Sequence, residues 1–470
     1  MTGIVEWLSS VLVPAALMLC GGFFLCYLRG GALRHPLLSV KSMLRPGRKG
    51  GVSPFRALTL ALAGTLGVGN IVGVASALAL GGPGAIFWMW VSALLAMTLK
   101  YAEIVLAMRT RKTDTDGTHT GGAMYYIRAA FGGRWAKFGV ALAALFALLC
   151  IADALSMGCL IQVNAVAGAF RGVFGVPLWV SGLVLALLTA LVVGRQASHL
   201  AFLTEWLVPL MSGGYLLLSI GVLCIRHDAI PEAFRMIFSG ICTVRGVGGG
   251  VFGFLSLRAI RFGTMRGLLS NEAGCGTAPI AHAASDSDSP AEQGFLGIVE
   301  VFVDTILLCT MTALVILVSP EVISAYATDG VMMTVAAFGA VFGAPAAGFL
   351  AIAVLLFGFA TVVCWSHYGA ECVRYLSRGR GWMNVYCVLV VGFVFVGALA
   401  APEAVWTIAD VTLGCMTLIN LFVLCRMRRE VRGETALYWR GRIGTDKAAA
   451  GRRRAQKKPT AGLTVQTVRR

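Results

Sequence analysis

Residues 65–70, Thr-Leu-Gly-Val-Gly-Asn, place a hydroxyl, a side-chain amide and two glycines inside an apolar run from Pro54 to Leu80. Glycine costs about 1 kcal/mol relative to alanine in a helix interior, so this segment favours local unwinding. Unwinding frees backbone amides and carbonyls, and within a bilayer these groups must be buried against protein or line a cavity. The segment therefore predicts a binding site for a small solute at the middle of a membrane span.

The composition places this segment in a membrane protein. Hydrophobic residues make up 58% of the 470 residues, charged residues only 13%, and the mean hydropathy is +0.81. Soluble globular chains are far more polar. Roughly 20 apolar residues cross a bilayer core of about 30 Å. Eleven runs of this kind are expected to be transmembrane helices: 8–28, 54–80, 83–108, 138–170, 177–194, 203–225, 244–266, 292–318, 347–376, 382–400 and 404–425.

Lysine and arginine gather on one side of these spans, which indicates the cytoplasmic side. The basic connections are 29–49, 109–137, 194–199, 258–266 and 374–380, whereas 226–235 and Arg245 lie on the other side. The amino terminus is therefore expected outside and the carboxyl terminus inside a cell (inner) membrane. Residues 426–470 hold 14 Lys and Arg against 3 Asp and Glu, which gives +11 of the net charge of +17. This tail is expected to be disordered and attracted to anionic membrane lipid rather than to nucleic acid.

A second glycine-rich stretch, residues 246–253, falls inside the seventh expected span. If each half of the chain opens with a glycine-broken helix, residues 51–240 and 241–425 form two five-helix repeats. The odd number of spans inverts the second repeat relative to the first. Residues 1–50 then supply one extra helix and a basic loop. The alternative interpretation is that these glycines serve only close helix packing.

Motifs of catalysis and metal binding do not occur in the sequence. It contains no GxSxG, no HExxH and no phosphate-binding loop. The 13 cysteines form no CxxC or Cys/His cluster and are interpreted as small apolar side chains. A membrane enzyme thus lacks a candidate nucleophile, acid–base pair or metal cluster, and the isolated polar positions do not form the rings of charge expected of a channel.

Several long segments resemble the alanine/glycine:cation symporter family of amino-acid–polyamine–cation type transporters. The segments are 67–71 (Gly-Val-Gly-Asn-Ile), 80–90, 100–103, 266–274 (Arg-Gly-Leu-Leu-Ser-Asn-Glu-Ala-Gly), 278–283 and 365–371, and the similarity extends from about Pro54 to Asn420. The resemblance implies sodium-coupled uptake of a small neutral amino acid, alanine or glycine. It implies an all-helical 5+5 inverted-repeat fold of the leucine-transporter type, with Na+ as the coupling ion and no other cofactor.

A zwitterionic amino acid needs hydrogen-bond partners for its carboxylate and its ammonium group in a site that excludes most water. Helix amino termini and free amides suit the carboxylate, and carbonyl and side-chain oxygens suit the ammonium group. The candidate substrate-binding residues are Thr65, Gly67, Gly69, Asn70, Gln162, Gly249, Gly250 and Trp365. Three of them keep a second interpretation: Gln162 as an interhelical hydrogen bond, Trp365 as packing, and Asn70 as a group that holds the break open.

Sodium prefers hard oxygen ligands, which carbonyls at an unwound helix and a threonine hydroxyl supply. By resemblance to the shared fold, the ion-binding groups are the carbonyls of Ala63 and Leu66 together with Thr361. Thr361 lies one helical turn before Trp365, so both face the same side of their span. The alternative for its hydroxyl is a bond to its own helix backbone.

Asp153 departs from the family pattern, in which a small apolar residue is usual at this position. A carboxylate buried in a span is costly enough to indicate a role or a partner. It leaves an alternative function open, that of a proton-coupled amino-acid transporter. Further departures at Cys159, Leu413, Ile419 and His367 leave the substrate range open.

The remaining acidic residues are interpreted first as gating ion pairs or solvated groups near span ends: Glu103, Glu205, Glu272, Glu300, Asp304 and Asp410. Residues 270–283 follow arginines that are expected to be cytoplasmic. We therefore expect this segment to be a gate at the inner face, with Glu272 and Arg266 as partners. Taken together, the sequence predicts a secondary symporter and not an enzyme.

Overall fold

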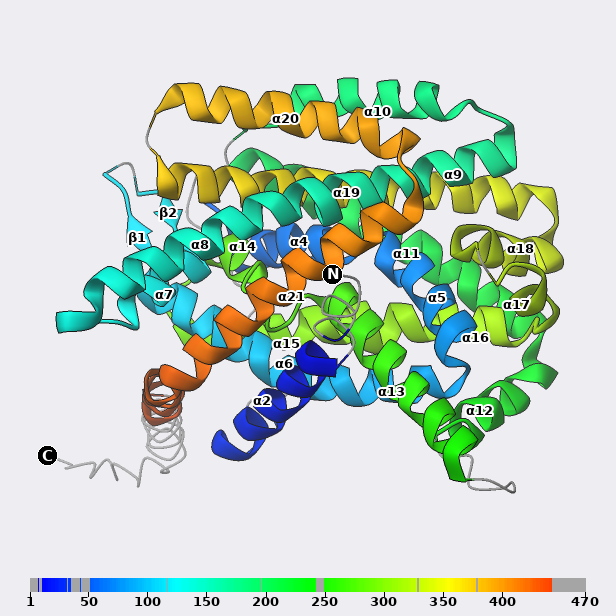
Figure 1. Cartoon of the computed structure of the whole chain (residues 1–470), viewed down its shortest axis with the longest axis horizontal. Helices are drawn as coiled ribbons and strands as arrows, with labels where there is room; N and C mark the ends of the chain where they lie inside the picture. Colours follow the sequence, from blue (N-terminus) through cyan, green and yellow to red (C-terminus); the bar gives the residue numbers. More distant parts are fainter. Residues whose placement is uncertain are drawn as a thin grey trace, which may run out of the picture.

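The structure is a computed structural model that describes residues 7, 11–31, 33–34, 43, 51–115, 117–195, 197–241, 249–327, 329–377 and 379–441. Its α-helices are α2 (Val13–Tyr27), α4 (Pro54–Thr65), α5 (Val72–Gly81), α6 (Gly84–Thr110), α7 (Ala123–Ala129), α8 (Ala136–Leu155), α9 (Gln162–Phe174), α10 (Leu178–Val192), α11 (Ala197–Ile225), α12 (Ile230–Ser239), α13 (Gly249–Asn271), α14 (Ala278–Ala283), α15 (Pro290–Val301), α16 (Thr310–Leu317), α17 (Glu321–Ala325), α18 (Gly330–Phe342), α19 (Ala344–Leu376), α20 (Arg380–Leu399) and α21 (Pro402–Arg426). Two short strands, β1 (Lys112–Thr113) and β2 (His119–Thr120), pair antiparallel. Figure 1 shows the long helices running side by side as one bundle.

Membrane-spanning helices dominate the described part of the chain. Seven helices there are long and apolar enough to cross a bilayer, and the bent pair α4 and α5 makes an eighth candidate. Each of the eleven expected runs coincides with one of these helices or with α2, α10 or α13. The helices α2 and α10 are shorter than a full span, and α13 contains three arginines.

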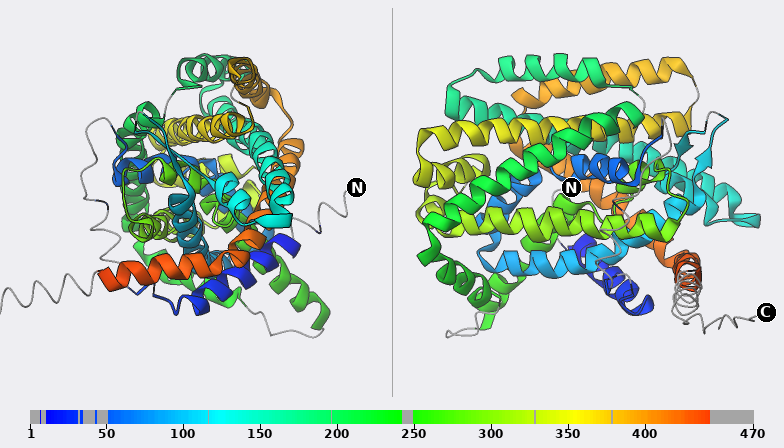
Figure 2. Two further views of the ribbon diagram at one scale, coloured as in Figure 1. Left: turned by 90° about the vertical axis from the view of Figure 1, so that its left-hand side faces the viewer. Right: turned by 180° about the vertical axis from the view of Figure 1, so that it is seen from behind.

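Large apolar side chains cover the outward surface of α10, α11 and α20. They include Trp179, Leu183, Leu187, Leu191, Trp206, Leu210, Leu217, Trp382 and Val388. Contiguous apolar surface of this kind is unfavourable in water, and in a bilayer it contacts the acyl chains. The helices α10 and α20 lie together at the edge of the bundle (Figures 1 and 2).

The predicted break in the second span is confirmed. The hydroxyl of Ser53 accepts a hydrogen bond from the Arg56 amide and caps α4, which ends at Thr65. One turn of 3-10 helix, η2 (Val68–Asn70), follows, and the axis then bends by 60° into α5. The bend places the carboxyl end of α4 and the amino end of α5 next to each other inside the bundle.

A second break separates α13 from α14, at residues 272–277. Three residues there have left-handed backbone conformations: Glu272 (φ 52°), Gly274 (φ 86°) and Gly276 (φ 81°). Glycine adopts such angles without penalty, whereas glutamate does so at a cost, so surrounding contacts must hold this segment. The segment that was expected to be an inner-face gate is therefore the second discontinuity of the fold.

The expected break at residues 246–253 is wrong for the part that the structure describes, and residues 246–248 lie outside that part. Gly249 and Gly250 begin α13, which continues without interruption for 23 residues. Further along the same helix, a glycine permits close helix packing of the kind that the alternative interpretation gave for residues 246–253. A Cβ atom on Gly263 would lie 2.2 Å from the carbonyl oxygen of Ala85 on α6.

The segment 258–266 is likewise not a cytoplasmic connection. Arg258, Arg261 and Arg266 all lie within α13, before the second break. In the sequence, three closely spaced arginines resemble a basic loop, because their spacing alone does not show that one helix continues through them. This half of α13 packs against α5 and α6, whereas α14 packs against α4 and α6.

Two wide π-helical turns interrupt long helices near the breaks. The turn η4 (Ser156–Ile161) joins α8 to α9, and η6 (Phe302–Cys309) joins α15 to α16. Such turns are rare and occur preferentially at functional positions. In this fold, η4 determines the direction of Gln162, and η6 carries Asp304.

Candidate functional site

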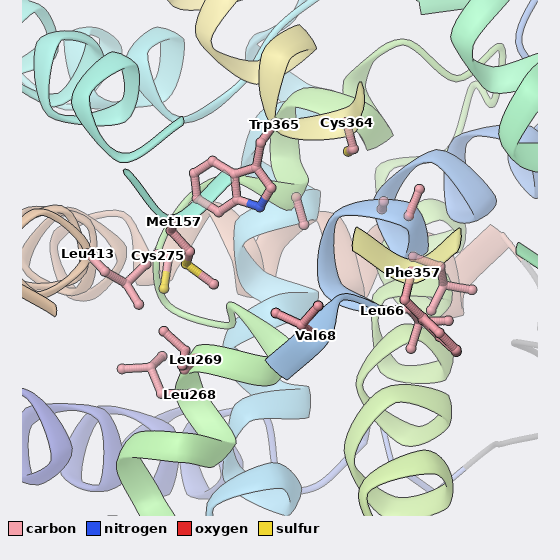
Figure 3. Close-up of a cluster of buried hydrophobic side chains, with 14 of the residues drawn as sticks. Leu66, Val68, Met157, Leu268, Leu269, Cys275, Phe357, Cys364, Trp365 and Leu413 are labelled. Atoms are coloured by element: carbon pink, nitrogen blue, oxygen red, sulfur yellow. The ribbon is translucent and has the colours of Figure 1, made fainter. Parts of the chain in front are cut away.

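A small cavity lies at the first break. It is lined by side chains and backbone from four parts of the chain: Gly64, Thr65, Gly67, Gly69, Met157, Ile161, Gln162, Leu269 and Trp406. Its volume is about 10 Å3, on a scale where one water molecule needs about 10–15 Å3. Figure 3 shows Val68, Met157 and Leu269 approaching this interior region from three different segments.

Gln162 holds the unwound backbone of the first break. Its Oε1 accepts a hydrogen bond of 3.1 Å from the amide of Val68, and its Nε2 donates one of 3.1 Å to the carbonyl of Met157. A Cβ atom on Gly67 would lie 2.9 Å from Gln162 Oε1 and 2.7 Å from Thr361 Oγ1. Only glycine therefore lets these three segments approach each other so closely.

Thr361 and Ala63 are brought together as the resemblance implied. The hydroxyl of Thr361 on α19 donates a hydrogen bond of 3.0 Å to the carbonyl of Ala63 on α4, so it bonds another helix and not its own. Leu66 directly follows the end of α4. The last carbonyls of a helix carry partial negative charge, so these oxygens form an environment that favours a small cation.

Asn70 contacts a buried carboxylate instead of lining the cavity. Its Nδ2 donates a hydrogen bond of 2.7 Å to Asp304 Oδ1. The other oxygen of Asp304 accepts bonds from Ser270 (2.8 Å) and Thr305 (2.6 Å). Asp304 is fully buried, so its interpretation as a solvated group is wrong. Because Asn70 belongs to the first break and Ser270 to the end of α13, Asp304 ties the two breaks together.

Trp365 also lies outside the cavity lining. Its side chain is fully buried, and its Nε1 donates a hydrogen bond of 2.9 Å to Glu272 Oε1. The other oxygen of Glu272 accepts a bond of 2.8 Å from Thr277. The two bonds fix the carboxylate within the second break and connect it to α19, which explains how Glu272 keeps its left-handed backbone.

Two further side chains hold the backbone of the second break. Glu103 Oε1 accepts a hydrogen bond of 3.0 Å from the amide of Gly276, and Asn420 donates one of 2.9 Å to the carbonyl of Gly274. Asn420 also donates to Glu103. Glu103 is fully buried, so its interpretation as a solvated group is wrong.

The expected pairing of Glu272 with Arg266 does not occur. The guanidinium of Arg266 lies 4.6 Å from the ring centre of Trp406, which lines the cavity. A cation over the face of an indole is attracted by its quadrupole, so Arg266 holds Trp406 in place. Arg266, the expected partner of Glu272 in a gate, therefore lies next to the cavity, on α13 before the second break.

A buried ion pair anchors α14; the sequence indicates Glu300 as a candidate for an ion pair but does not identify its partner. Lys100 Nζ lies 3.0 Å from Glu300 Oε1, and His282 Nε2 lies 3.1 Å from Glu300 Oε2. Gln293 Nε2 lies 2.8 Å from His282 Nδ1. All four side chains are fully buried. A lysine in the middle of an apolar span was the available signal, because it requires an acidic partner in the same layer.

Asp153 is buried one helical turn before Met157, which lines the cavity. Its Oδ1 accepts a hydrogen bond of 2.7 Å from Thr412 and lies 3.5 Å from the hydroxyl of Ser156. Its Oδ2 is buried and has no hydrogen-bond partner among the described residues. One half of this carboxyl group is therefore free to bind a proton or a small cation.

Gly249 and Gly250 do not line the cavity. They start α13, whereas Leu269, near the opposite end of that helix, reaches the cavity. Of the eight candidate substrate-binding residues, four line the cavity: Thr65, Gly67, Gly69 and Gln162.

Two known transporters are similar to this chain over most of its length. The sodium/alanine symporter AgcS of Methanococcus maripaludis is 38% identical over 393 residues, which cover 83% of this chain and 85% of that protein. The amino-acid carrier protein AlsT of Bacillus subtilis is 36% identical over 384 residues, which cover 81% of this chain and 79% of that protein.

A solved structure shows the fold, and a family model identifies the family. The substrate-bound, outward-open structure of a Na+-coupled sialic acid symporter covers 87% of this chain and 86% of its own, with a TM-score of 0.55 at 15% identity, so the two share a fold. A model of the sodium:alanine symporter family matches residues 1–450. The chain is thus a multi-pass membrane transporter without enzymatic activity, and it belongs to the sodium:alanine symporter family.

Proposed function

We propose that this transporter imports a small neutral amino acid, alanine or glycine, together with Na+ across the cell membrane. The observation that carries this proposal is the meeting of two discontinuous helices beside a cavity lined by Thr65, Gly67, Gly69 and Gln162. Membership of the sodium:alanine symporter family supports an amino acid and sodium as the transported species.

The helix ends at the breaks suit the two charges of an amino acid. The amino end of α5 carries partial positive charge and faces the unwound residues 67–70, so it attracts a carboxylate. The carboxyl end of α13 carries partial negative charge and attracts an ammonium group. Because the site of a Cβ on Gly69 is 3.7 Å from the Cα atom of Ser270, the two ends are close enough for one small zwitterion.

The cavity walls favour a small side chain. Met157, Ile161, Leu269 and Trp406 supply apolar surface that suits a methyl group or a hydrogen atom. In the present conformation the amide of Val68 is bonded to Gln162. The carboxylate of an entering substrate accepts the hydrogen bond of the Val68 amide in place of Gln162. The side-chain amide of Gln162 then turns and donates a hydrogen bond to the same carboxylate. The small volume means that the site widens when substrate binds.

Sodium is assigned to the hydroxyl of Thr361 and the carbonyls of Ala63 and Leu66. The ion and the substrate then use opposite sides of one unwound segment, because Gly67 lies against Thr361 and also lines the cavity. An ion that orders this segment prepares the amides that bind the carboxylate. Coupling follows from this shared backbone.

The fuller topology belongs to the same proposal. Eleven spans form two inverted five-helix repeats, 51–240 and 241–425, after the extra helix α2, with the amino terminus outside and the carboxyl terminus cytoplasmic. The half-helices α4 and α14 then lie on the inner side of the breaks, and α5 and α13 lie on the outer side. Movement of these halves against the rest of the bundle gives alternating access.

Uptake of radiolabelled alanine into proteoliposomes tests the proposal. An inward sodium gradient should drive concentrative uptake, which glycine inhibits and which serine, leucine and D-alanine inhibit less. Replacement of sodium by potassium on both sides is the control. Uptake that is indifferent to sodium would refute sodium coupling.

A second candidate, proton coupling, rests on the unpartnered Oδ2 of Asp153. An inward proton gradient without sodium should then drive uptake, and Asp153→Asn should abolish that component because an amide cannot release a proton. Thr412→Val is the matched variant, since it removes the partner of Oδ1 and leaves the carboxyl group. Proton-driven uptake that persists in Asp153→Asn, or that is absent in the wild type, would remove this candidate.

A further inference from the structure

The chain continues as a helix beyond α21, over residues 428–441, within the segment that was expected to be disordered. In Figure 1 this red-orange helix is seen end-on beside α7, at one end of the bundle. The left view of Figure 2 shows it side-on, at right angles to the long helices. It therefore lies along the membrane plane, at the end of the spans that also carries β1 and β2.

One face of this helix is fixed to the transporter core. The hydroxyl of Thr435 lies 2.9 Å from the hydroxyl of Tyr101 on α6. Glu434 forms an ion pair with Arg109, which also lies on α6. The ring of Tyr438 lies 5.4 Å from Phe295 on α15. These contacts make the helix part of the folded protein and not a free tail.

The opposite face is basic and exposed. Its arginines recur every three to eight residues, which puts them on one side of the helix. They are Arg429, Arg432 and Arg440, and no exposed acidic residue accompanies them among residues 428–441. Arg429 and Arg440 form no ion pair with another described residue, and Leu437 between them is 60% exposed.

We propose that this arginine face binds the headgroups of anionic phospholipids and that the bound lipid stabilises the docking of the 428–441 helix on α6 and α15. The inference rests on the proposed cytoplasmic position of the carboxyl terminus, because the cytoplasmic leaflet carries the anionic lipid.

Charge, orientation and composition select a lipid over other anionic partners. An amphipathic helix with arginines on its polar face and Trp, Tyr and Leu beside them is typical of a membrane interface. The helix lies in the membrane plane directly after a span, so headgroups reach it without any movement of the protein. An acidic soluble protein would have to approach past the same headgroups.

The docked face connects this surface to the transport site. Tyr101, which bonds Thr435, lies on α6 between Lys100 and Glu103. Glu103 accepts a hydrogen bond from the amide of Gly276 in the second break. Bound lipid thus acts on the helix that holds the second break in its present conformation.

Native mass spectrometry of the full-length protein, titrated with equal amounts of phosphatidylglycerol and phosphatidylcholine, tests this proposal without substrate or ion gradient. The wild-type protein should retain phosphatidylglycerol preferentially. The double variant Arg429→Gln/Arg440→Gln should bind it about 25-fold more weakly, because each arginine near an anionic surface contributes about fivefold. The melting temperature in phosphatidylcholine should be unchanged, since both side chains are exposed and neither forms an ion pair with a described residue.

Two matched variants make the result decisive. Arg429→Lys/Arg440→Lys keeps the charge and should retain most of the binding. Arg171→Gln/Arg226→Gln removes two exposed arginines on the opposite side of the membrane and should bind as the wild type does. The proposal is overturned if Arg429→Gln/Arg440→Gln binds phosphatidylglycerol as tightly as the wild type does. It is also overturned if Arg429→Lys/Arg440→Lys, or the variant at 171 and 226, loses as much of this binding as Arg429→Gln/Arg440→Gln. Loss of alanine uptake alone would concern the transport proposal and leave this one untouched.

Discussion

Replacement of Thr361 by valine removes one oxygen from the assigned sodium site while it preserves the shape of the side chain. The hydroxyl donates a hydrogen bond of 3.0 Å to the carbonyl of Ala63, and the side chain is fully buried. The position of a Cβ on Gly67, only 2.7 Å from that oxygen, shows how little space surrounds it. A water molecule therefore cannot take the place of the missing hydroxyl.

The magnitude follows from the loss of one buried polar contact. An unsatisfied buried group costs about 1–3 kcal/mol. At about 1.4 kcal/mol per factor of ten, the sodium concentration for half-maximal uptake should rise about 5- to 150-fold in Thr361→Val. Thr361→Ser keeps the oxygen and should stay within about threefold of the wild type, since serine differs only by a methyl group.

The assay is the initial rate of alanine uptake into proteoliposomes over a range of sodium concentrations at constant ionic strength. Thr334→Val is the matched control, because the buried hydroxyl of Thr334 bonds its own helix at the carbonyl of Gly330 (3.1 Å). The rise in melting temperature that sodium induces should also disappear in Thr361→Val. Normal sodium activation in that variant would refute the assignment of Thr361.

Three further predictions concern the supports of the site. Gly67→Ala forces a Cβ against Thr361 and Gln162, and at a cost of about 1–3 kcal/mol uptake should fall about tenfold in the same assay. Lys100→Met leaves Glu300 buried without its cation, so the free energy of unfolding should fall by about 3–5 kcal/mol and the melting temperature in detergent should fall with it. The double variant Lys100→Met/Glu300→Gln should recover part of this loss. The Sγ atoms of Cys20 and Cys425 lie 3.3 Å apart, so mild oxidation by a copper catalyst in air should join α2 to α21 in a disulfide that peptide mass analysis detects.

Each of these three has a simple control. Gly73→Ala should leave uptake unchanged, because a Cβ there would meet nothing within 4 Å. The double variant at 100 and 300 should melt above the single one, and equal melting would contradict the ion-pair argument. Cys20→Ser should abolish the cross-link, and a cross-link at Cys425 that persists in this variant would show that another cysteine is its partner.

The first break could be predicted from the sequence because its signal is local. Two glycines and an asparagine in one apolar run indicate unwinding without knowledge of any partner. The ion-binding set came from family resemblance, and the structure brings Thr361 to Ala63 although 298 positions separate them. The apolar runs also located the helices, since their length and composition are properties of the sequence alone.

The second break could not be found in the same way. The dense glycines at 246–253 give a stronger local signal than the isolated Gly274 and Gly276, yet the break forms where distant side chains satisfy the backbone. Glu103 reaches Gly276 from 173 positions away. The two interpretations of Trp365 stayed open for the same reason, because its partner Glu272 is 93 positions distant and no helical periodicity connects the two.

The π-helical turn η4 determines how the transporter responds to the loss of a single residue. Because Ser156–Ile161 forms a turn wider than an α-helical one, it holds one residue more than the regular helix would need. Deletion of one codon within η4 would restore an ordinary helix and leave the later side chains of α9 close to their present directions, whereas deletion of one codon in the regular helix α8 would rotate them by about 100° relative to the start of α8. Only the second deletion would turn Gln162 away from Val68, so a gene shortened within η4 would encode a protein that keeps the support of its first break.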